Sequence, residues 1–278
     1  MLLTISGGRV LNVSIVGSGL PTIILPKNIS HLRGRPATGR PGTTPGTFFV
    51  YEAAGSGASG PGPLPRTTSR IVADLEQSLA SAGLCPPYIV AGYSASGFEA
   101  LLFVYRNKQH TRGLILIDPS IPFMHQNLYQ MSPMLSQRED RERQRLADLL
   151  SELKKTASFS DAAQIERLVK LECQLSEWDN LHIGSSKEIA AILKEPQALD
   201  NISMLVLSAG KFDVEAFCRD EIREIWHSVH SAYAHLSSNG EHRILANCDH
   251  GSIAHQSDLL ASAMDEMILP HAPAWLSN

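Results

Sequence analysis

YIVAGYSASG, residues 88–97, is an apolar, β-branched run that ends in a turn of small residues, and an apolar segment with the length of a helix follows it up to Tyr105. A strand that passes through a sharp turn directly into a helix is the local structure of a nucleophile elbow. Such a turn lifts its central side chain above the sheet, over the N-terminus of the helix. The stretch therefore predicts that Ser94 is an activated nucleophile.

The turn departs from the G-x-S-x-G pattern at one position, because Ser96 stands where the pattern has glycine. Serine is still small, and Gly97 follows it directly, so we expect the tight turn to be tolerated. The alternative interpretation is a Gly/Ser-rich connection without chemistry. The position of this turn between an apolar strand and a helix favours the nucleophile elbow.

Strands and helices alternate on both sides of the elbow. Thr68–Ala82 has apolar residues at helical spacing and lies between two predicted strands, which is the crossover unit of a parallel sheet. Gly113–Ile117 is too apolar to face water on either side. These patterns predict an α/β fold with a mostly parallel, doubly wound sheet. Further strands are expected at 47–51, 202–207 and 243–245, further helices at 220–236 and 258–269, and two edge strands at 10–16 and 22–25.

The chain changes character after Pro122. Residues 137–194 are rich in charged residues and helical in pattern, with runs such as REDRER at 138–143. We therefore predict one core, residues 1–122 and 200–278, interrupted by a helical lid (cap) at 123–199. Leu128, Met131, Met134 and Trp178 of this insertion are candidates to cover the site. The Gly- and Pro-rich segments 27–47 and 55–65 are expected to be loops.

A serine nucleophile needs a base and an acid, and on a doubly wound sheet of this kind they follow it in the order acid, then histidine. His250 comes directly after the last predicted strand and before the last helix, so it is the predicted base. Asp118 and Asp213 each follow a predicted strand, and either could orient the imidazole. The alternative role for both is a helix or turn cap. His230, His235 and His242 are expected to face solvent.

Composition limits the classes of partner. The 278 residues are 43% hydrophobic and carry a formal net charge of −4, which favours neither nucleic acid nor an anionic membrane surface as a partner. The four cysteines are widely spaced and form no C-x-x-C pair, so we expect neither a metal site nor a disulfide framework. The N-terminal residues do not resemble a secretory signal, and no apolar run has transmembrane length. We expect a cytoplasmic protein that needs no cofactor and acts on a small molecule.

From Arg66 to His255 the order of landmarks resembles the α/β-hydrolase superfamily. PPYIVAGYS at 86–94 resembles its elbow, GLILIDPS at 113–120 the strand that follows, and CDHG at 248–251 its histidine loop. The resemblance implies the α/β-hydrolase fold and a serine hydrolase. The spacing from Ser94 to Asp118 is similar to that in haloalkane dehalogenases, whose acid lies on this earlier strand. This resemblance favours Asp118 as the acid, with Asp213 as its rival.

The chain departs from the superfamily at the oxyanion loop. Members usually carry His-Gly or Ala-Gly-x-Gly after the strand that matches Thr22–Leu25, whereas this chain has PKNIS at 26–30. Proline removes one backbone donor. We expect the N–H groups of Ala95 and of Asn28 or its neighbour Lys27 to hold the oxyanion.

These observations lead to three hypotheses for function. The leading one is hydrolysis of a carboxylic ester or lactone, on a small to medium and largely apolar substrate, through an acyl-enzyme. The altered oxyanion loop keeps a second hypothesis open, a ligand-binding or receptor-like protein with weak or no turnover. The third is a lyase-like, non-hydrolytic enzyme that uses the same triad.

Overall fold

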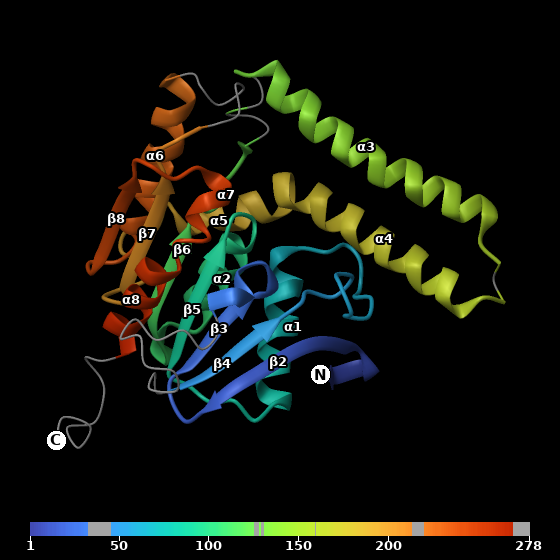
Figure 1. Cartoon of the computed structure of the whole chain (residues 1–278), viewed down its shortest axis with the longest axis horizontal. Coiled ribbons are helices and arrows are strands. Elements are labelled where there is room, and N and C mark those ends of the chain that lie inside the picture. The colour runs from blue at the N-terminus through green and yellow to red at the C-terminus, as the bar shows by residue number, and fades with distance from the viewer. Residues whose placement is uncertain (33–45, 125–127, 129–130, 159, 213–219, 269–278) are drawn as a thin grey trace.

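An eight-stranded sheet forms the centre of this computed structural model, which describes the whole chain except residues 33–45, 125–127, 129–130, 159, 213–219 and 269–278. Its strand order is β1-β2-β4-β3-β5-β6-β7-β8 (Figure 1). The pairs β1–β2 and β2–β4 are antiparallel, and all other neighbours are parallel. The strands are β1 Leu2–Thr4, β2 Val10–Ser18, β3 Thr22–Pro26, β4 Gly46–Tyr51, β5 Tyr88–Tyr93, β6 Thr111–Ile117, β7 Ser203–Ala209 and β8 Gly240–Leu245.

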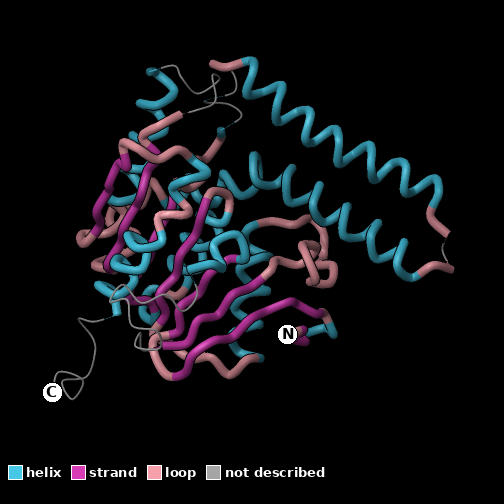
Figure 2. Tube along the Cα trace, viewed as in Figure 1, coloured by secondary structure: helices cyan, strands magenta, loops and turns pink. Residues whose placement is uncertain are grey.

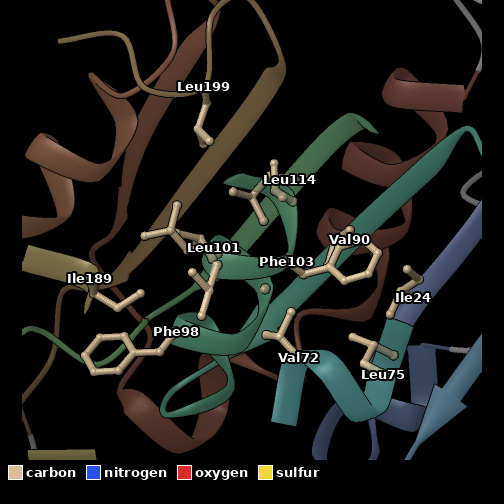
Figure 3. Close-up of a cluster of buried hydrophobic side chains, with 14 of the residues drawn as sticks. Ile24, Val72, Leu75, Val90, Phe98, Leu101, Phe103, Leu114, Ile189 and Leu199 are labelled. Atoms are coloured by element: carbon tan, nitrogen blue, oxygen red, sulfur yellow. The ribbon is translucent and has the colours of Figure 1, made fainter. Parts of the chain in front are cut away.

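Helices cover both faces of the sheet. Alternate residues of each strand point to opposite faces, so Val90 and Leu114 belong to one buried cluster and Ile89 and Ile115 to another. The first cluster packs against α1 (Thr68–Ser81), α2 (Ser96–Arg106) and α5 (Ser186–Ile192), and Figure 3 shows part of it. The second packs against α8 (Ser257–Ile268). Burial on both faces explains why these strands are continuous apolar runs, and it confirms the predicted doubly wound, mostly parallel sheet.

The prediction that residues 22–25 form an edge strand is wrong. β3 lies inside the sheet, paired in parallel with β4 on one side and β5 on the other. All five of its residues are buried. An unbroken apolar run is typical of a strand covered on both faces, but it does not reveal whether other strands pair with it on both sides, and this is the reason for the difference.

Two long helices, α3 (Pro133–Thr156) and α4 (Ala162–Asn180), form a hairpin that extends beyond the sheet (Figures 1 and 2). Ion pairs join the two helices, Arg143 with Asp179 and Lys154 with Glu172. A short π-helical segment, Leu181–Ser185, leads from α4 into α5. Nowhere in the described chain does a helix combine the length and the apolar content that crossing a membrane requires. The described residues between 123 and 199 lie mainly in α3, α4 and α5, and the role of this insertion as a lid remains a prediction.

Gly97 lets α2 approach the loop after β6 closely. A Cβ atom on this residue would lie 2.7 Å from Cβ of Pro119. We expect Gly97→Ala to lower the free energy of unfolding by about 1–3 kcal/mol, because this contact forces the helix away from the sheet. Urea denaturation followed by circular dichroism measures the loss.

Gly251→Ala is the matched control for this change. A Cβ atom there would meet only Oδ1 of Asp249, at an ordinary contact distance of 3.5 Å. We expect that variant to unfold within about 1 kcal/mol of the wild type, since overpacking is the cause of the penalty. Equal stabilities for the two variants would contradict the argument.

Candidate active site

Ser94 occupies the sharp turn between β5 and α2. Its φ is +55°, in the left-handed region that side chains other than glycine rarely adopt. Two backbone hydrogen bonds hold this conformation: the N–H of Ser94 donates to the carbonyl of Ile117 at 3.1 Å, and that of Ser120 donates to the carbonyl of Ser94 at 3.0 Å. The surrounding strands therefore stabilise a strained backbone, which is a feature of functional sites.

Ser96 replaces the glycine of the motif and takes part in the turn. Its Oγ donates to the carbonyl of Tyr93 at 2.8 Å and accepts from the N–H of the same residue at 2.9 Å. A Cβ on Gly92 would lie 2.6 Å from the carbonyl oxygen of Ser96, so Gly92 is where the elbow needs glycine. The hydroxyl of Ser96 thus closes the turn instead of obstructing it.

His250 is the first residue of the short helix α7 (His250–Ile253). Asp249 caps this helix, accepting from the N–H of Ser252 at 2.7 Å. Tyr93 fixes the histidine, because its ring stacks on the imidazole at 5.0 Å between centroids and its hydroxyl donates to the carbonyl of His250 at 2.7 Å. Nε2 of His250 lies 3.1 Å from Oγ of Ser94. The imidazole is therefore in place to take the proton of that hydroxyl.

Asp118 lies behind His250, with 2% of its surface exposed. Its Oδ2 is 2.6 Å from Nδ1 of His250, and its Oδ1 accepts from the N–H of Ala209 and from Nε1 of Trp226, both at 3.0 Å. Burial by itself would raise the pKa of this carboxyl, but the hydrogen bonds from His250 and Ala209 hold that pKa below its ordinary value. An ionised Asp118 accepts from Nδ1–H, which leaves Nε2 free to accept from Ser94.

The structure thus brings Ser94, His250 and Asp118 together from three separate segments. The rival acid, Asp213, lies outside the described residues. No three or more candidate metal ligands gather anywhere in the described part of the chain.

A series of side-chain hydrogen bonds beside Asp118 was not predicted from the sequence. Nε2 of His230 lies 2.7 Å from the carbonyl oxygen of Pro119, so it carries the proton, and Nδ1 accepts from the hydroxyl of Ser208 at 2.6 Å. That hydroxyl in turn accepts from Nε2 of His242 at 2.6 Å. Burial lowers the pKa of His230 to about 4, so this histidine is neutral. This series of hydrogen bonds anchors Pro119, the residue that follows Asp118.

The prediction that His230 and His242 face solvent is wrong, while His235 is exposed as predicted. His230 is fully buried, and His242 is half-buried. On α6 (Asp220–Ala234), His230 lies between the buried residues Trp226 and Tyr233 at helical spacing. That spacing places His230 on the apolar face of the helix, and it was the signal in the sequence from which the burial of His230 could have been predicted.

The predicted oxyanion residues lie on either side of the elbow. Ala95 follows Ser94 directly and is the N-cap of α2. Asn28 lies in the 3₁₀ segment Lys27–Leu32 after β3, and its Nδ2 donates to the carbonyl of Tyr93 at 3.4 Å. This contact places the turn after β3 next to the elbow. The use of these N–H groups in an oxyanion hole remains a prediction.

A cavity of about 270 Å³ opens beside Ala95, and its walls include residues of α1, α2, α3 and α4. We call it the Arg66 cavity; Arg66, Ile71, Ala95, Glu99, Glu177 and Trp178 line it. Of the apolar residues predicted to cover the site, Trp178 does line this cavity. Leu128 is buried with Ile222 and Trp226, Met131 packs against that cluster, and Met134 is exposed.

Comparison with known proteins gives a consistent set of similar structures. No family model matches the chain. A Bacillus subtilis (strain 168) protein named "Uncharacterized protein YqjL" is 26% identical over 191 residues, which are 69% of this chain and only 60% of that relative's length.

Several solved structures match almost the full chain. An esterase from Exiguobacterium antarcticum matches with a TM-score of 0.63 at 14% identity, over 96% of this chain and 98% of its own. A thermophilic esterase from Thermogutta terrifontis matches with a TM-score of 0.61 at 17% identity, over 100% of this chain and 97% of its own. The enol-lactonase from Burkholderia xenovorans LB400 matches with a TM-score of 0.61 at 13% identity, over 96% of this chain and 99% of its own. These likenesses concern the fold.

Proposed function

We propose, from the α/β-hydrolase fold that this chain shares with those esterase and lactonase structures, that it is a serine hydrolase that cleaves a carboxylic ester or lactone through an acyl-enzyme. One observation carries the proposal: Oγ of Ser94, the imidazole of His250 and the carboxylate of Asp118 form a continuous chain of 3.1 Å and 2.6 Å contacts at a nucleophile elbow. A serine hydroxyl becomes a competent nucleophile when a base is held in this way.

In the proposed reaction, His250 removes the proton of Ser94 as Oγ attacks the ester carbonyl. Asp118 stabilises the imidazolium that forms, and the N–H groups of Ala95 and Asn28 or its neighbour hold the oxyanion. The imidazolium then protonates the leaving alcohol, and the acyl group stays on Ser94. Water, activated by the same histidine, releases the acid. Asp213 is the rival for the role of Asp118.

The Arg66 cavity is the proposed place for the substrate. It begins at Ala95, next to the nucleophile, and Ile71 and Trp178 give it apolar walls. Its volume of about 270 Å³ fits a chain of small to medium size. In this proposal the α3–α4 hairpin acts as the lid, because Trp178 lies on α4.

Activity-based labelling tests the proposal. We expect a fluorophosphonate probe to modify the wild-type protein and mass spectrometry of its peptides to place the adduct on Ser94, since only an activated hydroxyl reacts quickly with it. His250→Ala should lose the labelling because the base is gone. The binding-protein hypothesis predicts no labelling in either form. An adduct on another serine would exclude Ser94 as the nucleophile.

A further inference from the structure

Arg66 is a buried cation with unused donors. Its side chain is fully buried, and Nη2 donates to Oδ2 of Asp74 at 3.0 Å. Its Nε and Nη1 have no hydrogen-bond partner among the described residues. Asp74 is also shared with the guanidinium of Arg9, so two cations divide one carboxylate. A buried charged group with open donors is costly, and it favours an anionic partner.

Two carboxyl groups line the same cavity without forming an ion pair with Arg66 in the described chain. Glu99 is 8% exposed, and the hydroxyl of Tyr51 donates to its Oε2 at 2.5 Å. Burial and repulsion from Glu177 raise the pKa of Glu99 to about 7, and burial also raises the pKa of Glu177. Below about pH 7 Glu99 is therefore protonated, and a protonated carboxyl donates a hydrogen bond.

These donors are reached from the nucleophile along one helix face. Ala95 and Glu99 are four residues apart at the start of α2, so they lie one above the other on the same side. Ala95 adjoins Ser94, and both Ala95 and Glu99 line the cavity with Arg66. A substrate chain that leaves the reacting carbonyl along this wall therefore enters the cavity that Arg66, Glu99 and Glu177 line.

We propose that the Arg66 cavity binds a substrate chain that ends in a carboxylate, so that half-esters of short dicarboxylic acids, or lactones with an acidic side chain, are preferred substrates. This proposal rests on the proposed serine hydrolase function. The carboxylate accepts from Nε and Nη1 of Arg66 and from the carboxyl of Glu99 or Glu177. An apolar chain end leaves the guanidinium unpaired, and an ammonium group is repelled by it.

Hydrolysis of three ethyl esters with equal chain lengths tests the preference: ethyl hydrogen adipate, ethyl hexanoate and ethyl 6-aminohexanoate. We expect kcat/KM for the half-ester to exceed that for the hexanoate by about tenfold or more, the size of a charge-assisted hydrogen bond. The amino ester should be the poorest substrate. Equal or higher kcat/KM for the hexanoate or the amino ester would overturn the proposal.

The pH dependence gives a second readout. The ratio of kcat/KM for the half-ester to that for the hexanoate cancels the pH dependence of the catalytic steps, which both reactions share. We expect the ratio to fall as pH rises through about 7, because Glu99 ionises there and then repels the carboxylate. Among the described residues, Tyr51, Arg66 and Glu177 are the charged or titratable groups that act on Glu99. A ratio that rises or stays constant would contradict the proposal.

Two variants separate recognition from folding. Arg66→Met should remove the preference for the half-ester, but it also breaks the ion pair with Asp74 and can prevent folding. Glu177→Gln keeps Arg66 and removes one of the two ionising groups. We expect this variant to retain a higher half-ester ratio than the wild type at about pH 8, since less repulsion remains. An unchanged pH profile in Glu177→Gln would exclude that residue from the site.

Calorimetry distinguishes failure of the proposed carboxylate site from failure of the proposed serine hydrolase function. We expect adipate to bind to the Ser94→Ala protein more tightly than hexanoate, whether or not any ester is hydrolysed. Adipate binding without turnover in the wild type would retain the carboxylate site and reject the hydrolase. Ester hydrolysis with no preference for adipate in either assay would retain the hydrolase and reject the site.

Discussion

Ser94→Ala should lower kcat for hydrolysis of p-nitrophenyl butyrate by at least about 10⁴-fold, because the loss of the nucleophile leaves only oxyanion stabilisation and binding. The 3.1 Å contact between Oγ of Ser94 and Nε2 of His250 disappears with the hydroxyl. Initial rates followed by p-nitrophenolate release, with the background rate subtracted, measure the effect. KM should change much less, since the side chain removed is small.

Ser96→Ala is the matched control, because it removes a serine hydroxyl two residues away in the same turn. That hydroxyl bonds only to the backbone of Tyr93 among the described residues. We expect this variant to keep kcat within about tenfold, since two hydrogen bonds that shape the elbow are lost but no reacting group is. A Ser94→Ala protein as active as the Ser96→Ala protein would exclude the acyl-enzyme.

Asp118→Asn should lower kcat by about 10⁴-fold through the tautomer of His250. Oδ1 of Asp118 accepts from two donors, the N–H of Ala209 and Nε1 of Trp226. The oxygen of an asparagine amide would therefore take that position, and its NH₂ would face Nδ1 of His250. This forces the proton onto Nε2, so that this nitrogen can no longer accept a hydrogen bond from Ser94. The loss should appear in kcat more than in KM.

Asp213→Asn is the control for this experiment, because Asp213 is the rival acid. We expect it to keep kcat within about tenfold, as for a residue that only caps a helix. Circular dichroism of both variants checks that they remain folded. A large loss in Asp213→Asn with little change in Asp118→Asn would reverse the assignment of the acid.

Local sequence patterns were sufficient for most of the fold. A strand, a turn of small residues and a helix follow one another at 88–106, and the structure has β5, the Ser94 turn and α2 there. Burial on both faces makes a parallel strand apolar throughout, so β6 and β7 were also evident. Strand order was less accessible. The same pattern fits a central strand and an end strand, and β3 was therefore misplaced at an edge.

The sequence by itself determined the candidate nucleophile and base, because Ser94 and His250 each stand at a strand end that local periodicity reveals. Only the tertiary structure decided that Asp118 meets His250, that His230 is buried beside it, and that Arg66, Glu99 and Glu177 line one cavity. These contacts join residues far apart in the chain, and strand order, helix packing and burial create them. No spacing in the sequence records which distant charges will share one enclosed space.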